Sequence, residues 1–398
     1  MNILYYIPEI TQSNGGVRQY ACALLKILAR DKKNRYFILH NMHDSVVISV
    51  VENNYNLELI PVHIGREGRI EKIVRYTRQL INQVLVRAHL VKRTQILSHV
   101  ERLCNRYKIN IVYCPYQYTP KTTRKTVSTL HDVQELHCPQ FFTPKERLDR
   151  AKLHKFITEQ SSIIMVSYEH VKQDLITYFQ RTNENVVVCL LAMQNLWFDK
   201  FTSEDIINLD LYDLPEKFMF YPAVSWPHKN HIGLLKAIAF LRDKCQVKIH
   251  VVFTGYQTEY FSQIKEMVAQ LRLEQQLRFL GVVNEKVLYS LYRTAWAVIV
   301  PTLYEAGSFP LMESILMGVP VVSSDVTSLP DTIGDRRYTF KASNTVDMVN
   351  KIKKIYFDDT YRYENMQNSF RQADKLRNTN ALTKVREVML KLGNDIEN

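Results

Sequence analysis

Short apolar runs alternate with segments of helical periodicity along almost the whole chain. In the first half, the runs have the length and composition of buried β-strands. They are Met1–Ile7, Tyr36–His40, Leu57–Val62, Ile109–Tyr113, Val127–Leu130, Ile163–Val166 and Val186–Leu191. Helical periods lie between them at Val17–Arg30, Pro144–Gln160 and Glu169–Gln180. Alternation of this kind predicts parallel sheets that are covered by helices on both faces.

The same alternation restarts after residue 217. Strands are predicted at Phe218–Tyr221, Lys248–Phe253, Leu277–Leu280, Ala297–Val300 and Val319–Ser323, with helices near 229–243, 258–272, 285–294 and 309–317. We therefore expect an α/β fold of two doubly wound, Rossmann-like domains that face each other across a cleft. The expected divisions are a first domain over 1–193, an acidic linker without clear periodicity over 194–217, a second domain over 218–375, and a C-terminal helix over 376–398 that can pack back on the first domain.

Composition narrows the class of protein. With 46% hydrophobic and 23% charged residues in 398, the chain is globular. No apolar run reaches the roughly 20 residues of a spanning helix, and the N-terminus is interpreted as a strand and not as a secretory signal. Six cysteines without a C-x-x-C pair indicate reduced cytoplasmic thiols, with no metal site. The net charge of +12 points to an anionic partner. Because the sequence contains no nucleic-acid-binding motif, we expect this partner to be a phosphorylated ligand or an acidic lipid and not a nucleic acid.

The segment "YEAGSFPLMESILMGVPVV", residues 304–322, places two glutamates eight positions apart at the end of a predicted strand. Ser308 is a candidate helix cap, so Glu305 falls in the loop and Glu313 about one turn into the helix. The backbone amides of Gly307, Ser308 and Phe309 would then point outward at the positive helix end, which suits a diphosphate. The two carboxylates would flank that anion and accept hydrogen bonds from hydroxyl groups. The alternative is an ordinary capped helix with an exposed glutamate.

A second candidate follows another predicted strand, in "YPAVSWPHKNHIGLL", residues 221–235. His228 and Lys229 lie beside the N-terminus of the next helix, where a cation opposes the helix dipole by about 0.3–1 kcal/mol. A bound phosphate would reverse that effect, so Lys229 is a candidate diphosphate ligand. A solvated surface lysine is the alternative.

Two further candidates follow strands of the first domain. Gly15 and Gly16 in "NGGVRQY" open the first helix, and adjacent glycines let a backbone approach a ligand closely. A simple turn is the alternative, and the absence of G-x-G-x-x-G counts against a dinucleotide. His131 in "TLHDVQELH" follows another predicted strand, and at the carboxyl edge of the sheet it would face the cleft. A purely structural histidine is the alternative.

Together these segments resemble the retaining glycosyltransferases of family 4, which have the GT-B fold. The resemblance covers nearly the whole chain and also includes "VSYEHVKQDL" (166–175), "FTGYQ" (253–257) and "LGVVNEKVLYSLYRTA" (280–295). It implies that a sugar is transferred from a nucleotide-sugar donor to a glycan or polyprenyl-diphosphate-linked saccharide, with retention of the anomeric configuration. Mannose or a related hexose is a candidate sugar, and the setting would be bacterial surface polysaccharide synthesis. It further implies that no metal or other cofactor is required.

The resemblance also implies a role for each candidate residue. Glu305 corresponds to the first glutamate of E-x7-E, near the transferred sugar, and His131 is placed beside the sugar ring. Glu313 corresponds to the glutamate that holds the ribose hydroxyls, Lys229 to the basic residue on the diphosphate, and Gly16 to the loop over the donor. Two departures from the family pattern are Val224, where arginine is frequent, and Ala306–Phe309, where Gly-Phe-Gly-Leu is usual.

Residues 66–108 contain eleven Lys or Arg and three Glu. An apolar stripe at helical period lies opposite a basic face that includes Tyr76, Val86 and Leu90, a mixture suited to an anionic membrane surface. A solvated basic face is the alternative.

For the whole chain, the alternatives to a transferase are a sugar-nucleotide 2-epimerase on the same fold, a non-catalytic sugar-nucleotide-binding protein, and a nucleic-acid binder suggested by charge alone. We expect a cytoplasmic protein, peripheral to the membrane if the basic face binds it.

Overall fold

The computed structural model describes residues 1–8, 15–40, 44–61, 77, 99–191, 193–194 and 196–397. Its first sheet contains seven parallel strands in the order β3-β2-β1-β4-β5-β6-β7. Their bounds are β1 Asn2–Ile7, β2 Arg35–His40, β3 Leu57–Pro61, β4 Ile111–Cys114, β5 Lys125–Thr129, β6 Ile163–Val166 and β7 Val186–Val188. The strand order reverses between β1 and β4, and ligands of such sheets bind at this point.

The second sheet contains six parallel strands in the order β10-β9-β8-β11-β12-β13. Their bounds are β8 Phe218–Pro222, β9 His250–Thr254, β10 Leu277–Phe279, β11 Ala297–Val300, β12 Val321–Ser324 and β13 Thr339–Phe340. Here the order reverses between β8 and β11. The loops that follow these two strands therefore lie side by side at the carboxyl edge of the sheet.

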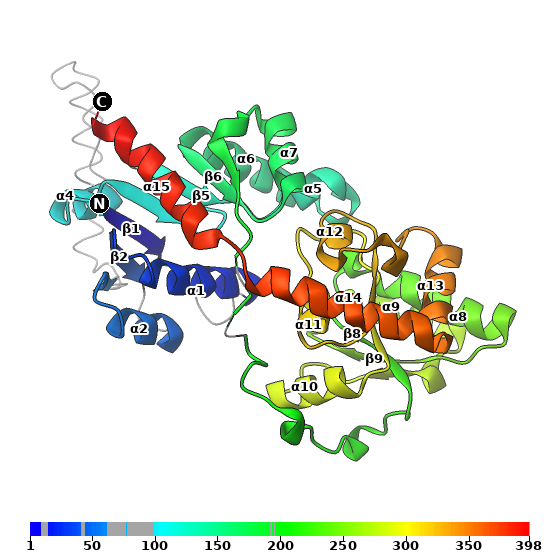
Figure 1. Cartoon of the computed structure of the whole chain (residues 1–398). Coiled ribbons are helices and arrows are strands. Elements are labelled where there is room, and N and C mark those ends of the chain that lie inside the picture. The colour runs from blue at the N-terminus through cyan, green and yellow to red at the C-terminus, as the bar shows by residue number, and fades with distance from the viewer. Residues whose placement is uncertain are drawn as a thin grey trace.

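Helices cover both sheets (Figure 1). Those in the first half are α1 Gly15–Ala29, α2 Ser45–Glu52, α4 His99–Arg106, α5 Gln134–His137, α6 Pro144–Gln160 and α7 Glu169–Phe179. Those in the second half are α8 His231–Cys245, α9 Phe261–Leu271, α10 Glu285–Thr294, α11 Phe309–Leu316, α12 Leu329–Ile333, α13 Thr345–Phe357 and α14 Asp359–Arg377. The predicted α/β fold with two doubly wound sheets is confirmed.

The last helix, α15 (Ala381–Glu397), returns to the first sheet, as Figure 1 shows. Its apolar side chains Val385, Val388, Met389 and Leu392 join the buried cluster formed by β1 and α1. Arg386 Nε donates to the buried Asp31 carboxylate at 2.8 Å, and Lys384 Nζ donates to the Val188 carbonyl at 2.7 Å. The chain thus crosses between its two sheets twice, once through 194–217 and once between α14 and α15.

Several observed elements were not predicted, among them the helices α5, α12, α13 and α14. Strand β13 was not predicted, since two residues are too few to reveal a strand pattern. Helix α2 was not predicted either, although Asp44 caps it by accepting from the Val46 N–H at 3.0 Å. The proposed basic face over 66–108 lies outside the described residues, except for residue 77 and 99–108. None of the helices in the described ranges is both long and apolar enough to cross a membrane.

Candidate active site

A cavity of about 650 Å³ lies between the two sheets and contacts eight of the ten predicted site residues. These eight are Gly16, His131, His228, Lys229, Glu305, Gly307, Phe309 and Glu313. The other two lie directly beside it in sequence: Gly15 begins α1, and Ser308 is a buried helix cap. Residues from both halves of the chain therefore converge on one cavity.

Lys229 and Glu305 come from the neighbouring loops after β8 and β11, and they form an ion pair through Nζ and Oε1. The loops are tied together because the His228 carbonyl accepts from Thr302 Oγ1 at 2.9 Å and from the Leu303 N–H at 2.7 Å. Thr327 Oγ1 in turn donates to the carbonyl of Glu305. The pair is thus held by backbone contacts on both sides.

Asn230 fixes the direction in which the Lys229 loop enters α8. Its backbone is left-handed, with φ of 60°, and its side-chain amide donates to the Pro301 carbonyl at 2.9 Å. A Cβ at Gly233 would lie 2.3 Å from Asn230 Oδ1, so glycine at 233 leaves room for this side chain. The sequence Lys-Asn-His-Ile-Gly therefore specifies the local geometry that presents Lys229.

The N-terminus of α11 forms the adjoining wall of the cavity. Ser308 caps the helix by accepting from the Leu311 N–H at 3.5 Å, and Pro310 occupies its first turn. Within the described chain, no recorded hydrogen bond is donated by the backbone N–H of Gly307, Ser308 or Phe309. Helix N-termini with available amides favour anions such as phosphate.

At Gly307 the second half of the molecule lies close to Tyr168 of the first half. A Cβ there would lie 2.1 Å from the Tyr168 hydroxyl oxygen, so no larger residue fits without displacement of that ring. Gly16 similarly faces the Phe309 ring, which a Cβ would approach to 3.2 Å. These contacts explain why glycine stands at both positions where a bulky side chain would separate the halves.

Glu313 accepts one hydrogen bond at each carboxylate oxygen. Trp197 Nε1 donates to Oε1 at 2.7 Å, and the Tyr292 hydroxyl donates to Oε2 at 2.7 Å. Burial holds the pKa of Glu313 above its usual value, although these two hydrogen bonds act in the opposite direction and favour the charged carboxylate. The glutamate is a fixed acceptor at the edge of the cavity.

His131 lies against the edge of the Tyr20 ring, with ring centroids 4.8 Å apart. Burial lowers the pKa of His131 to about 4, although the nearby Asp132 acts in the opposite direction. The imidazole is therefore neutral at physiological pH. Its Nε2 atom has no hydrogen-bond partner among the described residues.

The electrostatics separate the two basic candidates of the second domain. Burial, with help from the charge of Lys229, lowers the pKa of His228 to about 3, so this ring is neutral and contributes no positive charge. Burial also lowers the pKa of Lys229, and the Asp132 carboxylate opposes that shift. Lys229 is consequently the cation beside Glu305, whose Oε2 is buried without a partner in the described chain. This arrangement can bind a diphosphate and accept hydrogen bonds from a neighbouring polyol.

Sequence reasoning missed three residues that shape this site: Tyr168, Trp197 and Tyr292. Tyr168 contacts the second domain, where its hydroxyl lies 3.8 Å from Met312 Sδ. Trp197 belongs to the segment interpreted only as a linker, and Tyr292 is fully buried on α10. Their roles depend on contacts between distant segments, for which the sequence pattern has no signal.

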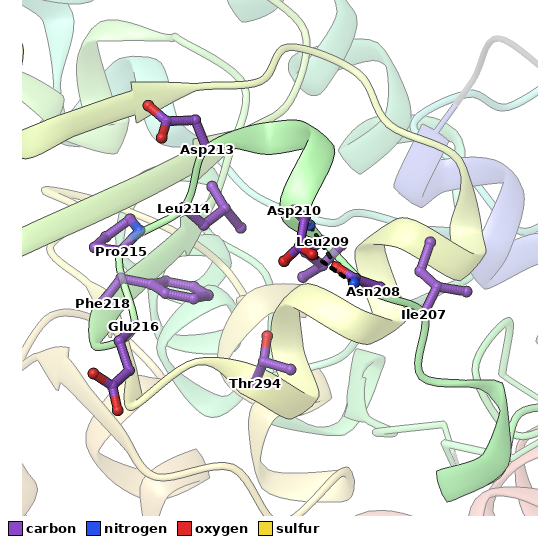
Figure 2. Close-up of a pocket in the computed structure, with 10 residues that line it drawn as sticks. All are labelled: Ile207, Asn208, Leu209, Asp210, Asp213, Leu214, Pro215, Glu216, Phe218 and Thr294. Carbon is purple, nitrogen blue, oxygen red and sulfur yellow. Dashed lines mark hydrogen bonds between the residues drawn. The ribbon is translucent and has the colours of Figure 1, made fainter.

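A second cavity, of about 480 Å³, lies between the linker and α10 (Figure 2). It is lined by residues 207–210, 213–216, Phe218 and Thr294, none of which is a predicted site residue. Asn208 and Asp210 bond to each other, and Arg278 pairs with Asp213 at 2.7 Å. Over the described ranges, no group of three or more His, Cys, Asp and Glu side chains is arranged to hold a metal ion.

Two parallel α/β domains with a cavity at their facing carboxyl edges define the GT-B fold. Solved structures with similar folds support this: Anabaena Alr3699/HepE in complex with UDP and glucose has a TM-score of 0.66 at 16% identity, covering 99% of this chain and 100% of that one. WaaG, a glycosyltransferase involved in lipopolysaccharide biosynthesis, has a TM-score of 0.63 at 12% identity and covers 98% of each chain. At such identities the likeness shows the fold.

Sequence comparison adds the class of enzyme. Residues 205–376 match the family model described as glycosyl transferases group 1. The chain is 28% identical over 367 residues to O-antigen chain mannosyltransferase B of Escherichia coli, covering 91% of this chain and 92% of that protein. It is 26% identical over 215 residues to O-antigen chain mannosyltransferase RfbU of Salmonella typhimurium, covering 54% of this chain and 56% of that protein. Together these matches support a glycosyltransferase.

Proposed function

We propose that the protein is a retaining hexosyltransferase that moves a hexose from a nucleotide-sugar donor to a glycan or lipid-linked saccharide in bacterial surface polysaccharide synthesis. The observation that carries the proposal is the buried ion pair of Lys229 and Glu305 beside the open N-terminus of α11. A cation and helix amides suit a diphosphate, and carboxylates on either side suit the hydroxyl groups of a sugar and a ribose. A nucleotide-sugar has all three parts in that order.

In this proposal the diphosphate binds between Lys229 and the amides of residues 307–309. Transfer breaks the bond between the anomeric carbon and the phosphate oxygen. The acceptor oxygen forms its bond to that carbon on the same face of the sugar, and the proton of the acceptor hydroxyl passes to the departing phosphate oxygen. The departing diphosphate gains negative charge, which Lys229 and the helix N-terminus stabilise without a metal ion. Glu305 accepts hydrogen bonds from the reacting hexose, and neutral His131 lies beside it. Glu313 accepts from the ribose.

The relatives suggest the sugar and the pathway. Both reported sequence relatives are named as O-antigen chain mannosyltransferases, which supports mannose as the first donor sugar to test and a growing surface glycan as acceptor. A fold neighbour binds UDP and glucose, which supports a nucleotide donor but leaves the base open. An acceptor on a membrane lipid would place the protein at the cytoplasmic membrane face, where the basic residues of 66–108 suit anionic lipids.

The first experiment is a thermal-shift panel of GDP-, UDP- and dTDP-hexoses, because a ligand that binds the folded state raises the melting temperature by mass action. The stabilising donor is then incubated with and without acceptor glycans from O-antigen repeats. Acceptor-dependent release of nucleoside diphosphate, with an α-linked product from an α-linked donor, supports a retaining transferase. Conversion of the donor without acceptor would identify an epimerase, and donor binding without turnover would identify a binding protein.

A further inference from the structure

Trp197 reaches Glu313 from the segment that joins the two sheets. The indole is 116 residues away in sequence from the glutamate, and it donates from Nε1 to Oε1 at 2.7 Å. Both residues line the cavity between the domains. The contact therefore connects a residue between the domains to one of the two glutamates of the candidate donor site.

The segment that carries Trp197 is anchored at three positions that follow it. Asp199 pairs with Arg377 at the end of α14 at 2.8 Å, and the Phe201 ring packs on Tyr289 of α10 with centroids 5.2 Å apart. The N–H of Ile207 donates to Ser290 Oγ at 3.0 Å. With this support the indole occupies a defined position, so its N–H points at one carboxylate oxygen.

The second donor to Glu313 comes from a different element. Tyr292 on α10 is fully buried, and its ring packs edge-on against Phe220 of β8 with centroids 5.1 Å apart. Its hydroxyl donates to Oε2 at 2.7 Å. A carboxylate has about four lone-pair sites, so with one donor at each oxygen both oxygens can accept a further hydrogen bond. Two fixed donors thus define the carboxylate plane while each oxygen keeps the capacity to accept from a ligand.

We propose that Trp197 is a positioning residue that, together with Tyr292, orients the Glu313 carboxylate to accept hydrogen bonds from the vicinal hydroxyl groups of a nucleotide ribose. This inference rests on the proposed function, because it requires the donor to be a nucleotide-sugar with ribose at Glu313. Loss of the indole N–H leaves Glu313 in place but frees its carboxylate to rotate, and this weakens the interaction specific to the ribose hydroxyls.

The test measures how strongly each variant distinguishes ribose from 2′-deoxyribose. Dissociation constants are determined by calorimetry for GDP, UDP and their 2′-deoxy forms, with the tighter-binding base used throughout. A hydrogen bond to a charged group corresponds to about tenfold or more in affinity, so the wild-type protein should prefer the ribonucleotide by that factor. Glu313→Ala should abolish the preference, and both Trp197→Phe and Tyr292→Phe should reduce it at least threefold.

Trp296→Phe is the matched control, because Trp296 Nε1 donates to the Ile355 carbonyl at 3.2 Å and the residue does not line the cavity. This variant also loses an indole hydrogen bond and should keep the full preference. A merely structural role of Trp197 would lower the affinity for both nucleotides equally and leave their ratio unchanged. Thermal melting verifies that each variant is folded, and Tyr292→Phe decides the question if Trp197→Phe does not fold.

Each remaining outcome has a definite meaning. If Glu313→Ala loses the ribose preference but Trp197→Phe and Tyr292→Phe keep it, the positioning role is wrong and the proposed function stands. If Trp197→Phe binds both nucleotides more tightly than wild type, the indole obstructs the site, and the inference is overturned. If GDP and UDP do not bind the wild-type protein at millimolar concentration, the inference fails, and the proposed function fails with it if no donor of the thermal-shift panel binds either.

Discussion

The ion pair between Lys229 and Glu305 makes a quantitative prediction that needs no substrate. The Glu305 side chain is 9% exposed and that of Lys229 17%, and Glu305 Oε2 has no partner in the described chain. Replacing Lys229 with Met removes the cation and leaves a buried carboxylate uncompensated. Breaking a buried pair in this way costs about 3–5 kcal/mol in the free energy of unfolding. We expect a loss near the lower value because the cavity borders solvent.

A second substitution separates the buried charge from the loss of packing. Adding Glu305→Gln to Lys229→Met removes the stranded charge, so the double variant should be more stable than Lys229→Met by roughly 2 kcal/mol. Lys229→Met alone should lose about 10²–10³-fold in catalytic rate, since the leaving diphosphate lacks its cation, and the double variant, which also lacks the Glu305 carboxylate, should not recover it. Stability is measured by urea unfolding at pH 7, and the rate by release of nucleoside diphosphate.

The matched control is Lys200→Met, which breaks the pair between Lys200 and Glu285. These side chains are 59% and 54% exposed, so the pair contributes about 0–1 kcal/mol. If Lys229→Met and Lys200→Met lose equally little stability, or if Glu305→Gln restores none of the loss, Glu305 does not carry an uncompensated buried charge and the description of the site is wrong.

Three further predictions concern other parts of the account. Gly307→Ala should lower the free energy of unfolding in urea by about 1–3 kcal/mol because its Cβ would meet the Tyr168 hydroxyl oxygen at 2.1 Å. Adding Tyr168→Leu to the same chain should restore most of the lost stability, and the absence of any rescue would refute the contact. His131 has a pKa of about 4, below the roughly 6.5 of an unfolded histidine, so below pH 6.5 the unfolded state binds the proton first and wild-type stability falls. The stability difference between wild type and His131→Asn should therefore change by up to about 1.4 kcal/mol per pH unit between pH 6.5 and 4, whereas a constant difference would mean that the ring is not held neutral. Reversing Arg75, Arg78 and Arg87 to Glu should sharply reduce sedimentation with anionic liposomes at low salt, since each basic residue near such a surface contributes about 1 kcal/mol. If the wild-type protein does not bind these liposomes, the basic face is only solvated.

The sequence was informative wherever a strand ends in a chemically unusual loop. The apolar runs of β6 and β11 predicted the strands correctly because residues buried on both faces leave a continuous apolar pattern. Glu305 and Lys229 were both predicted as site residues because each follows a predicted strand, and ligands of such sheets bind at the carboxyl ends of the strands. No such rule applies to Trp197, whose partner is 116 residues away. The environment of His228 also escaped prediction, since a neutral ring results from burial that the sequence does not reveal.

The central claim is that Glu305 acts on the sugar of a nucleotide-sugar bound in the cavity between the two domains. The most direct test is the turnover of Glu305→Gln, measured as acceptor-dependent release of nucleoside diphosphate with a donor and acceptor established for the wild-type protein. The account predicts that turnover is lost while the variant stays folded and still binds the nucleoside diphosphate alone, with a lower melting temperature because Lys229 loses its partner. Turnover at the wild-type rate would contradict it.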